Sequence, residues 1–224
     1  MAELNSNHAV LIGEKLRAAR EQRKMSLREL AVKAEISASM LSQIENGKAY
    51  PSVRSTYNIA AALALPVDYF FPEIEKEPAV VAQDQMTPSD LRDAQLNGTV
   101  GSNVPEYGVA KDGAVPVLHQ EARPIISLKG GIEWARLTAH AEPDAEFMEI
   151  TYAPGGSSGE RMSHHSGREF GLVLEGELTI ELGFEQYCLG QGDSIVFDST
   201  TPHRLMNQAK TPMRALWVVL NPLR

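Results

Sequence analysis

The first 72 residues have apolar positions spaced three or four apart, a pattern typical of short amphipathic helices. Ile12, Leu16 and Ala19 mark the buried face of the first predicted helix. The second begins at Ser26, because Glu29 three residues later completes a capping box. The other predicted helices are a third capped by Ser37 and ended by Gly47, a fourth opened by Pro51 and Ser52, and a short turn at 66–71.

The second and third predicted helices are joined by a tight turn inside a small bundle, which is the helix-turn-helix arrangement. In this arrangement the second helix of the pair presents its N-terminal residues to the major groove of DNA. A glutamine there can pair with adenine, and serines can donate to or accept from base edges. The alternative is a plain helical bundle with a polar face. The outward residues of the predicted reading helix are Ser37, Ala38, Ser39, Ser42 and Gln43.

The segment LRELAVKAEISASMLSQIENGKAYPS, residues 27–52, resembles the helix-turn-helix core of the XRE family, the phage Cro/repressor type. The resemblance covers residues 10–72. One departure is Glu35, which stands in the turn where the family often has glycine, a position of positive φ. The resemblance implies base contacts from Ser37, Ala38, Ser39 and Gln43, and phosphate contacts from Asn46 and Lys48. Arg28, near the start of the second helix, is a further candidate for a phosphate contact.

From residue 115 onward the pattern changes to short apolar runs separated by glycine-containing turns, which predicts an antiparallel β-sandwich or barrel. Residues 73–114 are broken by glycine and proline, and we expect a partly ordered linker there with one short helix at 87–97. The predicted organisation is an all-α bundle at 1–72, this linker at 73–114 and a β-domain at 115–224. Strands are predicted at 115–118, 124–128, 132–138, 147–153, 170–174, 177–182, 186–189, 194–198, 204–207 and 214–220.

Candidate ligand residues gather in the second half of the predicted β-domain. His165 and Glu169 lie on the two sides of one turn, and His203 comes from a later strand. Two imidazoles and one carboxylate are a sufficient set for a divalent metal, with coordination positions left for water or another ligand. The same histidines also suit a metal-free pocket lined by hydrogen-bonded polar groups.

The spacing of His165, Glu169 and Gly176, and then of Gly192, His203 and Asn207, resembles the two motifs of the cupin family. The resemblance covers residues 115–222 and implies a double-stranded β-helix barrel. It also implies one divalent metal, Zn, Fe, Ni or Mn, on His165, Glu169 and His203. Ser163 replaces the family's usual first histidine, and the adjacent His164 faces the opposite side of a strand. The residues expected around an effector are Arg136, Arg161, Arg204 and Asn207.

The charge is unevenly distributed along the chain, which has a net charge of −8. Residues 10–54 carry nine basic and five acidic side chains, a net charge of +4, which indicates that the helical part is the one that meets nucleic acid. The single cysteine, Cys188, excludes an internal disulfide and is expected to be a small core residue. We find neither a secretory signal nor a membrane span, so a cytoplasmic protein is expected.

These features together predict a transcriptional regulator, not an enzyme. A homodimer would bind double-stranded DNA at a palindromic operator, and the cupin domain would sense a small-molecule effector. Repression is expected more than activation from the family resemblance. The alternative is a mononuclear metal-dependent enzyme, such as an epoxidase or a dioxygenase, that uses His165, Glu169 and His203.

Overall fold

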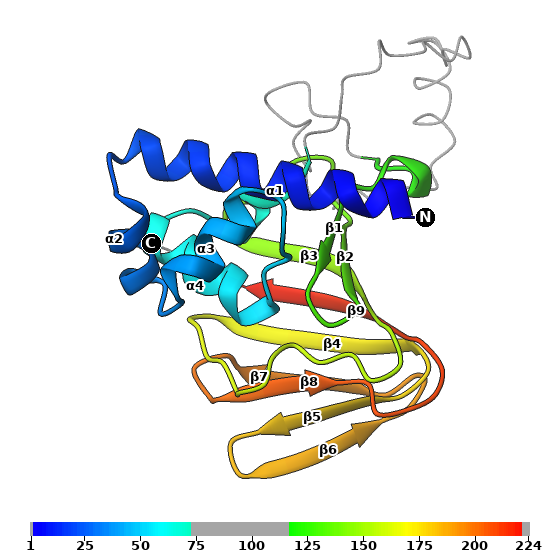
Figure 1. The fold of residues 1–224 in the computed structure, drawn as a ribbon. Coiled ribbons are helices and arrows are strands. Elements are labelled where there is room, and N and C mark those ends of the chain that lie inside the picture. The colour runs from blue at the N-terminus through cyan, green and yellow to red at the C-terminus, as the bar shows by residue number, and fades with distance from the viewer. Residues whose placement is uncertain (1, 73–116, 221–224) are drawn as a thin grey trace, which may run out of the picture.

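A computed structural model describes residues 2–72 and 117–220. Residues 2–72 form a helical part and residues 117–220 form a β part, and the helices lie against one end of the strands (Figure 1). The predicted linker at 73–114 and its helix at 87–97 lie outside the described residues. The domain boundaries given above therefore stay predictions.

The helical part contains the helices that the apolar spacing predicts. Ser26 forms the predicted capping box, with its hydroxyl accepting from the backbone N–H of Glu29 at 3.2 Å and its own N–H donating to the Glu29 carboxylate at 2.7 Å. Glu35 in the following turn has a φ of 54°, the left-handed conformation that favours glycine. The elements are α1 (Ala2–Gln22), α2 (Leu27–Lys33), α3 (Ala38–Glu45), α4 (Val53–Leu63) and the short 3-10 helix η1 (Val67–Phe70).

The β part consists of two antiparallel sheets in the order β1-β2-β3-β9-β4-β7 and β6-β5-β8. With the helix-turn-helix that precedes them, these sheets confirm the predicted fold class, a helical bundle followed by antiparallel β structure. Alternate residues along the long strands β3 and β9 are buried between the sheets. The strands are β1 (Ile125–Leu128), β2 (Ile132–Arg136), β3 (Ala145–Tyr152), β4 (Arg168–Glu175), β5 (Leu178–Leu182), β6 (Glu185–Leu189), β7 (Ser194–Asp198), β8 (His203–Met206) and β9 (Met213–Leu220).

Two local predictions about the β part are wrong. The strand expected at 115–118 is not formed at Val117 and Leu118, where an irregular segment leads into the 3-10 turn η2 (Gln120–Ala122). An apolar run becomes a strand only where a neighbour offers pairing and packing. Cys188 is exposed instead of buried, because β6 lies at the edge of the three-stranded sheet and leaves most of its residues in solvent.

The helical part packs directly on the β part. The backbone N–H of Lys129, in the β1–β2 turn, donates to the carbonyl of Pro51 at 2.9 Å, just before α4 begins. Beyond the end of α4, the buried carboxylate of Asp68 lies 4.0 Å from the guanidinium of Arg136 in β2. These two contacts hold α4 and η1 against the β part at both ends.

Candidate functional site

The helix α3 separates a buried apolar side from an exposed polar side. Leu41 and Ile44 are fully buried, whereas Ser37, Ser39 and Gln43 are exposed. The hydroxyl of Ser37 accepts from the backbone N–H of Met40 at 3.1 Å and caps the helix. Ala38 and Ser42 are half-buried beside this surface. We call Ser37, Ser39 and Gln43 the exposed face of α3.

A buried ion pair, which the sequence reasoning did not find, fixes α3 against α1. The guanidinium of Arg20 donates to the two carboxylate oxygens of Glu45 at 2.6 and 2.9 Å. Glu45 is 5% exposed, and this bidentate pairing offsets the cost of burying its carboxylate. Both residues lie on predicted helices, and a charged residue inside the apolar stripe of α3 was the available signal.

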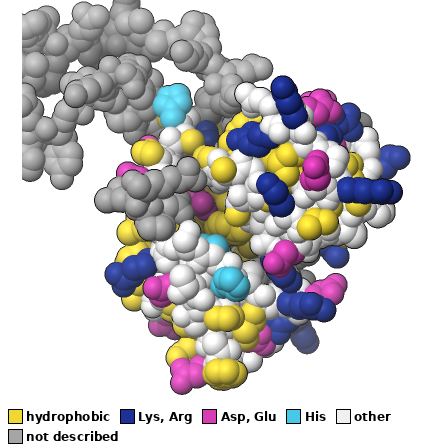
Figure 2. All heavy atoms as spheres, turned by 90° about the vertical axis from the view of Figure 1, so that its left-hand side faces the viewer, with side chains coloured by type: hydrophobic (Ala, Val, Ile, Leu, Met, Phe, Trp, Pro, Cys, Tyr) yellow, Lys and Arg dark blue, Asp and Glu magenta, His cyan; other side chains and the backbone are white. Residues whose placement is uncertain are grey.

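The residues predicted to contact phosphates differ in whether their side chains already form hydrogen bonds within the protein. Arg28 and Lys48 are exposed. Asn46 already accepts from Arg17 at 2.7 Å through its carbonyl oxygen, and its amide nitrogen donates to the backbone carbonyl of Ser42 at 2.7 Å. Figure 2 shows Lys and Arg side chains gathered over the helical part on the face that carries α2 and α3.

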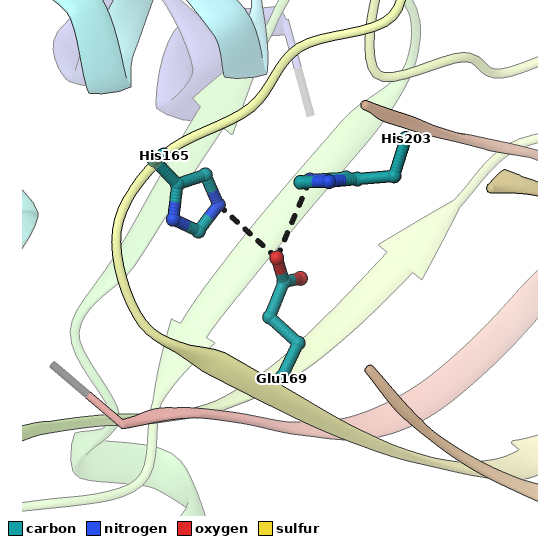
Figure 3. A group of neighbouring side chains, drawn as sticks. All are labelled: His165, Glu169 and His203. Atoms are coloured by element: carbon teal, nitrogen blue, oxygen red, sulfur yellow. Dashed lines mark ion pairs between the residues drawn. The ribbon is translucent and has the colours of Figure 1, made fainter. Parts of the chain in front are cut away.

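The predicted ligand residues of the β part converge on one point (Figure 3). His165 lies in the segment before β4, Glu169 lies in β4 and His203 begins β8. The Nε2 atoms of His165 and His203 lie 3.1 and 3.3 Å from the same carboxylate oxygen, Oε1 of Glu169. One ligand atom from each residue falls within 4.8 Å of the others. The structure therefore brings together three side chains that span 39 positions of sequence.

In each ligand residue, the polar atom that faces away from the common point also forms a hydrogen bond. Nδ1 of His165 lies 3.0 Å from the carbonyl of Ser166, and Nδ1 of His203 lies 2.9 Å from the carbonyl of Thr201. A carbonyl only accepts, so each Nδ1 carries a proton, and this hydrogen bond turns the Nε2 atom of each ring toward Glu169. The second carboxylate oxygen of Glu169 accepts from Nε1 of Trp217 at 2.7 Å.

The electrostatics of the cluster keep Glu169 ionised. Burial raises the pKa of Glu169, but its contacts with His165 and His203 outweigh burial, and the net pKa is lowered. Burial lowers the pKa of His165, while attraction to Glu169 outweighs it and leaves the net pKa raised. For His203, burial prevails over Glu169, and the pKa is lowered. A carboxylate thus stands between two imidazoles of different basicity.

The residues present fit a divalent cation. Oε1 of Glu169 is buried and accepts no hydrogen bond of normal geometry from the described residues, despite its two short contacts. Three electron-pair donors that face a common point, with their outer atoms bonded elsewhere, are the usual surroundings of a metal ion. Ser163, at the position of the missing family histidine, also lines this cavity, whereas His164 is exposed as its place on the opposite face predicts.

The residues expected around an effector do not gather in one place. Arg136 is buried against Asp68 and donates to the carbonyls of Thr138 and Ala139 at 3.0 and 3.2 Å. Arg204 forms a bidentate pair with Glu181 at 2.8 and 2.9 Å and, with the exposed Arg161, borders an open cleft between the two parts. The buried amide of Asn207 donates to the carbonyls of Tyr152 and Thr211 at 2.9 and 2.8 Å, respectively.

Tyr57, which lines the cavity, and its hydrogen-bond partner Glu146 were both missed as site residues. Tyr57 lies on the apolar stripe of α4, which predicts a core position, but its ring stacks on His165 and its hydroxyl donates to Glu146 at 2.9 Å. Burial raises the pKa of Glu146 to about 7, against the opposing effect of the Tyr57 hydrogen bond. A glutamate on the buried side of a regular strand, β3, was the one local signal.

Comparisons with known proteins agree with this two-part structure. A family model described as helix-turn-helix matches residues 16–70, and one described as cupin domain matches residues 148–219. Each match falls within one of the two parts, so the family resemblances and the fold divide the chain in the same way.

Similar proteins come from several bacteria. The HTH-type transcriptional regulator PuuR of Escherichia coli K12 is 27% identical over 206 residues, which are 90% of each chain. The HTH-type transcriptional repressor RghR of Bacillus subtilis is 42% identical over 57 residues, 25% of this chain and 42% of that protein. The crystal structure of an HTH_3 family transcriptional regulator from Vibrio cholerae covers 98% of this chain and 99% of its own at a TM-score of 0.62 and 21% identity. This chain therefore combines an XRE-type helix-turn-helix domain with a cupin domain.

Proposed function

We propose that this protein is a DNA-binding transcriptional regulator, a repressor, whose cupin domain senses a small molecule through a metal-bearing cavity. The observation that carries the proposal is the exposed face of α3. Small hydroxyl groups and one amide stand there on a helix whose other side is buried, so the helix can approach base edges closely. Similarity to named transcriptional regulators supports the same reading.

The DNA-contacting role is assigned to the whole predicted set, which divides into residues at base edges and residues at phosphates. Gln43 offers both an amide donor and an acceptor to adenine, and the serines adapt to either base partner. Arg28 and Lys48 are placed at the phosphates, where exposed cations fix the position of the protein on the duplex. Asn46 is also placed at a phosphate, and its hydrogen bonds with Arg17 and Ser42 fix its side chain at the end of α3. The residues proposed to contact DNA are Arg28, Ser37, Ala38, Ser39, Ser42, Gln43, Asn46 and Lys48.

A second copy of the chain is proposed to cover the outer face of the larger sheet. Phe170 lies between Val196 and Val218 on the neighbouring strands, and Leu172 lies beside Leu216. Phe170, Leu172 and Val196 are 37, 37 and 51% exposed, respectively. A continuous exposed apolar face of this kind marks an interaction surface, and a two-fold axis brings the same face of each copy together.

The dimer is tested by measuring sedimentation of Phe170→Asp. We expect the variant to shift from dimer to monomer and to bind a two-half-site operator at least tenfold more weakly, because one protomer reaches one half-site. The matched control is Phe184→Asp, at the fully exposed β5–β6 turn. An unchanged dimer for Phe170→Asp would place the partner surface elsewhere.

The metal is proposed to be Zn, Fe, Ni or Mn on His165, Glu169 and His203. Imidazole and carboxylate ligands suit these ions, and the cluster needs positive charge between its three donors. Purified protein should carry near-stoichiometric metal that His203→Ala loses. His140→Ala, a histidine of the β2–β3 segment, is the control. A fully folded wild-type protein that takes up none of these ions would leave a metal-free sensor.

The enzyme alternative rests on the triad alone. An epoxidase or dioxygenase would use the same His165, Glu169 and His203, but it has no use for the cationic helical part and the exposed face of α3. We therefore favour the regulator, which acts on DNA in the cytoplasm. Among the described residues, no helix has both the length and the apolar character needed to cross a membrane.

The deciding experiment is selection of bound fragments from the host's genomic DNA by the full chain. The selection is run at about physiological salt, where sequence-independent phosphate attraction is weakened. We expect enrichment of a palindromic site, and we expect Gln43→Ala to lose about 1–3 kcal/mol of affinity and relax the preference at one base pair of each half-site. No enrichment by folded, metal-loaded protein would contradict the regulator and favour catalysis in the cavity.

A further inference from the structure

The cavity that contains the triad is walled on one side by the DNA-binding part. Val53 and Tyr57 of α4 line it together with residues of the β part. The ribbon shows α4 beside the strands of the β part (Figure 1). Its volume is about 20 Å³, which is room for roughly one water molecule. An organic ligand of even a few heavy atoms therefore needs one wall to move before it reaches Glu169.

Tyr57 makes three separate contacts in this wall. Its ring stacks on His165, with the ring centres 4.2 Å apart and an angle of 7° between the planes. It meets Trp134 edge-on at 5.8 Å, and its hydroxyl donates to the buried carboxylate of Glu146 at 2.9 Å. One side chain of the DNA-binding part thus touches a metal-ligand candidate, an aromatic wall and a buried acid.

The wall that can move is α4. His165, Trp134 and Glu146 belong to the β part, where β2 is paired with β3 along the whole of β2, and β3 is paired with β9 along the whole of β3. Tyr57 belongs to the helical part, which meets the β part through apolar packing, the Pro51–Lys129 hydrogen bond and the Asp68–Arg136 pair, with no strand pairing across the boundary among the described residues. The bundle can tilt as a unit, whereas opening the β part would break sheet hydrogen bonds.

We propose that Tyr57 is a removable plug of the sensor cavity, so that ligand entry and the docking of α4 exclude each other. This inference rests on the proposed regulatory function and specifies how the two parts communicate. The entering molecule replaces the phenol on Glu146, so it presents a hydroxyl or amine donor to that carboxylate. When α4 leaves its seat, α3 moves with it, because α2 packs against both helices, and the spacing of paired reading helices in a dimer changes.

The first test is the access of acrylamide to the two tryptophans of the chain. Trp134 and Trp217 both line the cavity and are 3% exposed, so their fluorescence reports on the plug. We expect Tyr57→Ala to raise the quenching constant at least threefold with excitation that selects tryptophan. The control Tyr69→Ala removes another tyrosine of the helical part, one that contacts Lys15, and should leave quenching unchanged.

The second test follows a metal probe. Wild-type protein is loaded with Co²⁺, and its removal by an excess of chelator is timed. Tyr57→Ala should release Co²⁺ at least tenfold faster than wild type, with Tyr69→Ala again as the control. If circular dichroism shows that Tyr57→Ala is unfolded, Tyr57→Leu replaces it, because leucine neither stacks on His165 nor bonds to Glu146. Folded variants with wild-type quenching and release rates would overturn the plug.

The third test asks whether DNA binding changes access to the cavity through Tyr57. A saturating amount of the operator duplex selected above should change the Co²⁺ release rate of wild type at least threefold, and should not change that of Tyr57→Ala. Equal rates in wild type with and without bound duplex would overturn the coupling. A protein that binds no duplex contradicts the regulator instead, and one that binds no Co²⁺ contradicts the metal site, while acrylamide quenching still decides the plug.

Discussion

The exposed face of α3 and the cavity beside Glu169 hold their polar groups in opposite ways. On α3, Ser39 and Gln43 lie in solvent, and the order of that face comes from the buried side of the helix. In the cavity, each ligand residue is held by a second group, such as Trp217 on Glu169. The polar groups of α3 are therefore free to bond to DNA, whereas those of the cavity are held in a fixed geometry by neighbouring groups before a ligand binds.

The largest expected effect, on the free energy of unfolding, comes from breaking the Arg20–Glu45 ion pair that fixes α3 against α1. Arg20→Ala leaves the buried carboxylate of Glu45 without its bidentate partner, which costs about 3–5 kcal/mol of unfolding free energy. Urea unfolding followed by circular dichroism should show the loss in the helical signal. The tryptophan fluorescence of the cavity should change less.

The control for this prediction is Arg23→Ala, which removes a hydrogen bond only to the carbonyl of Ala19 one turn earlier. Substitutions of this kind stay within about 0.5 kcal/mol. If Arg20→Ala and Arg23→Ala unfold alike, the buried pair does not support α3.

The cavity side responds to pH through Glu146. Its folded pKa of about 7 lies above the ordinary value of 4.5 because of burial, so its contribution to stability is complete below pH 4.5 and is lost as pH rises to 7. Glu146→Gln keeps an acceptor for Tyr57 and loses no stability in that window. The difference between the two unfolding free energies should grow by about 3 kcal/mol in favour of the variant.

The comparison with Glu146→Gln is needed because Asp68, His165 and Glu169 lie close enough to influence the same titration. Each of them is present in both proteins, so their own titrations largely cancel in the difference, while their coupling to the Glu146 carboxylate is already part of its pKa of about 7. Glu133→Gln, at an exposed position of β2, controls for the loss of one negative charge. A difference that stays constant between pH 4.5 and 7 would contradict a raised pKa for the buried carboxyl of Glu146.

Removing the hydrogen bond that Trp217 donates to Glu169 should have a smaller effect, on metal affinity. Trp217→Phe keeps a ring but loses the donor that lies 2.7 Å from the carboxylate, and we expect metal affinity to fall about 10–100-fold. Trp134→Phe, in the same cavity, controls for the loss of an indole. Competition with a chelator of known affinity measures both, and equal affinities would show that Trp217 only fills space.

The sequence predicts local features well and long-range ones poorly. The caps at Ser26 and Ser37 depend on neighbours three residues away, and the triad has family spacing, so both are visible in the sequence. The Tyr57–Glu146 contact joins residues 89 positions apart across the two parts. Apolar periodicity marks Tyr57 as buried but does not distinguish the bundle core from the face against the β part.

The same reasoning explains the residues whose surroundings were misjudged. Alternation along β2 places Arg136 on a buried face, but only the packing of η1 supplies Asp68 as its neighbour. Cys188 has the apolar neighbours of a core residue, yet its strand lies at an edge. Strand order and the docking of one part on the other decide both cases, and neither is encoded in a local window.

The smallest expected effect returns to the DNA side and tests Lys48. The side chain is exposed after the end of α3, in a loop that resembles the family's phosphate-contacting segment. Lys48→Ala should weaken operator and random DNA by the same factor and lower the slope of log affinity against log salt by about one per protomer. When salt rises from 50 to 200 mM, each phosphate contact makes the affinity fall by about a further three- to fourfold, and Lys48→Ala should no longer show that part of the fall. Lys33→Ala, an exposed lysine of α2, is the matched control. A loss confined to the operator would assign Lys48 to base reading, and an unchanged slope would remove it from the interface.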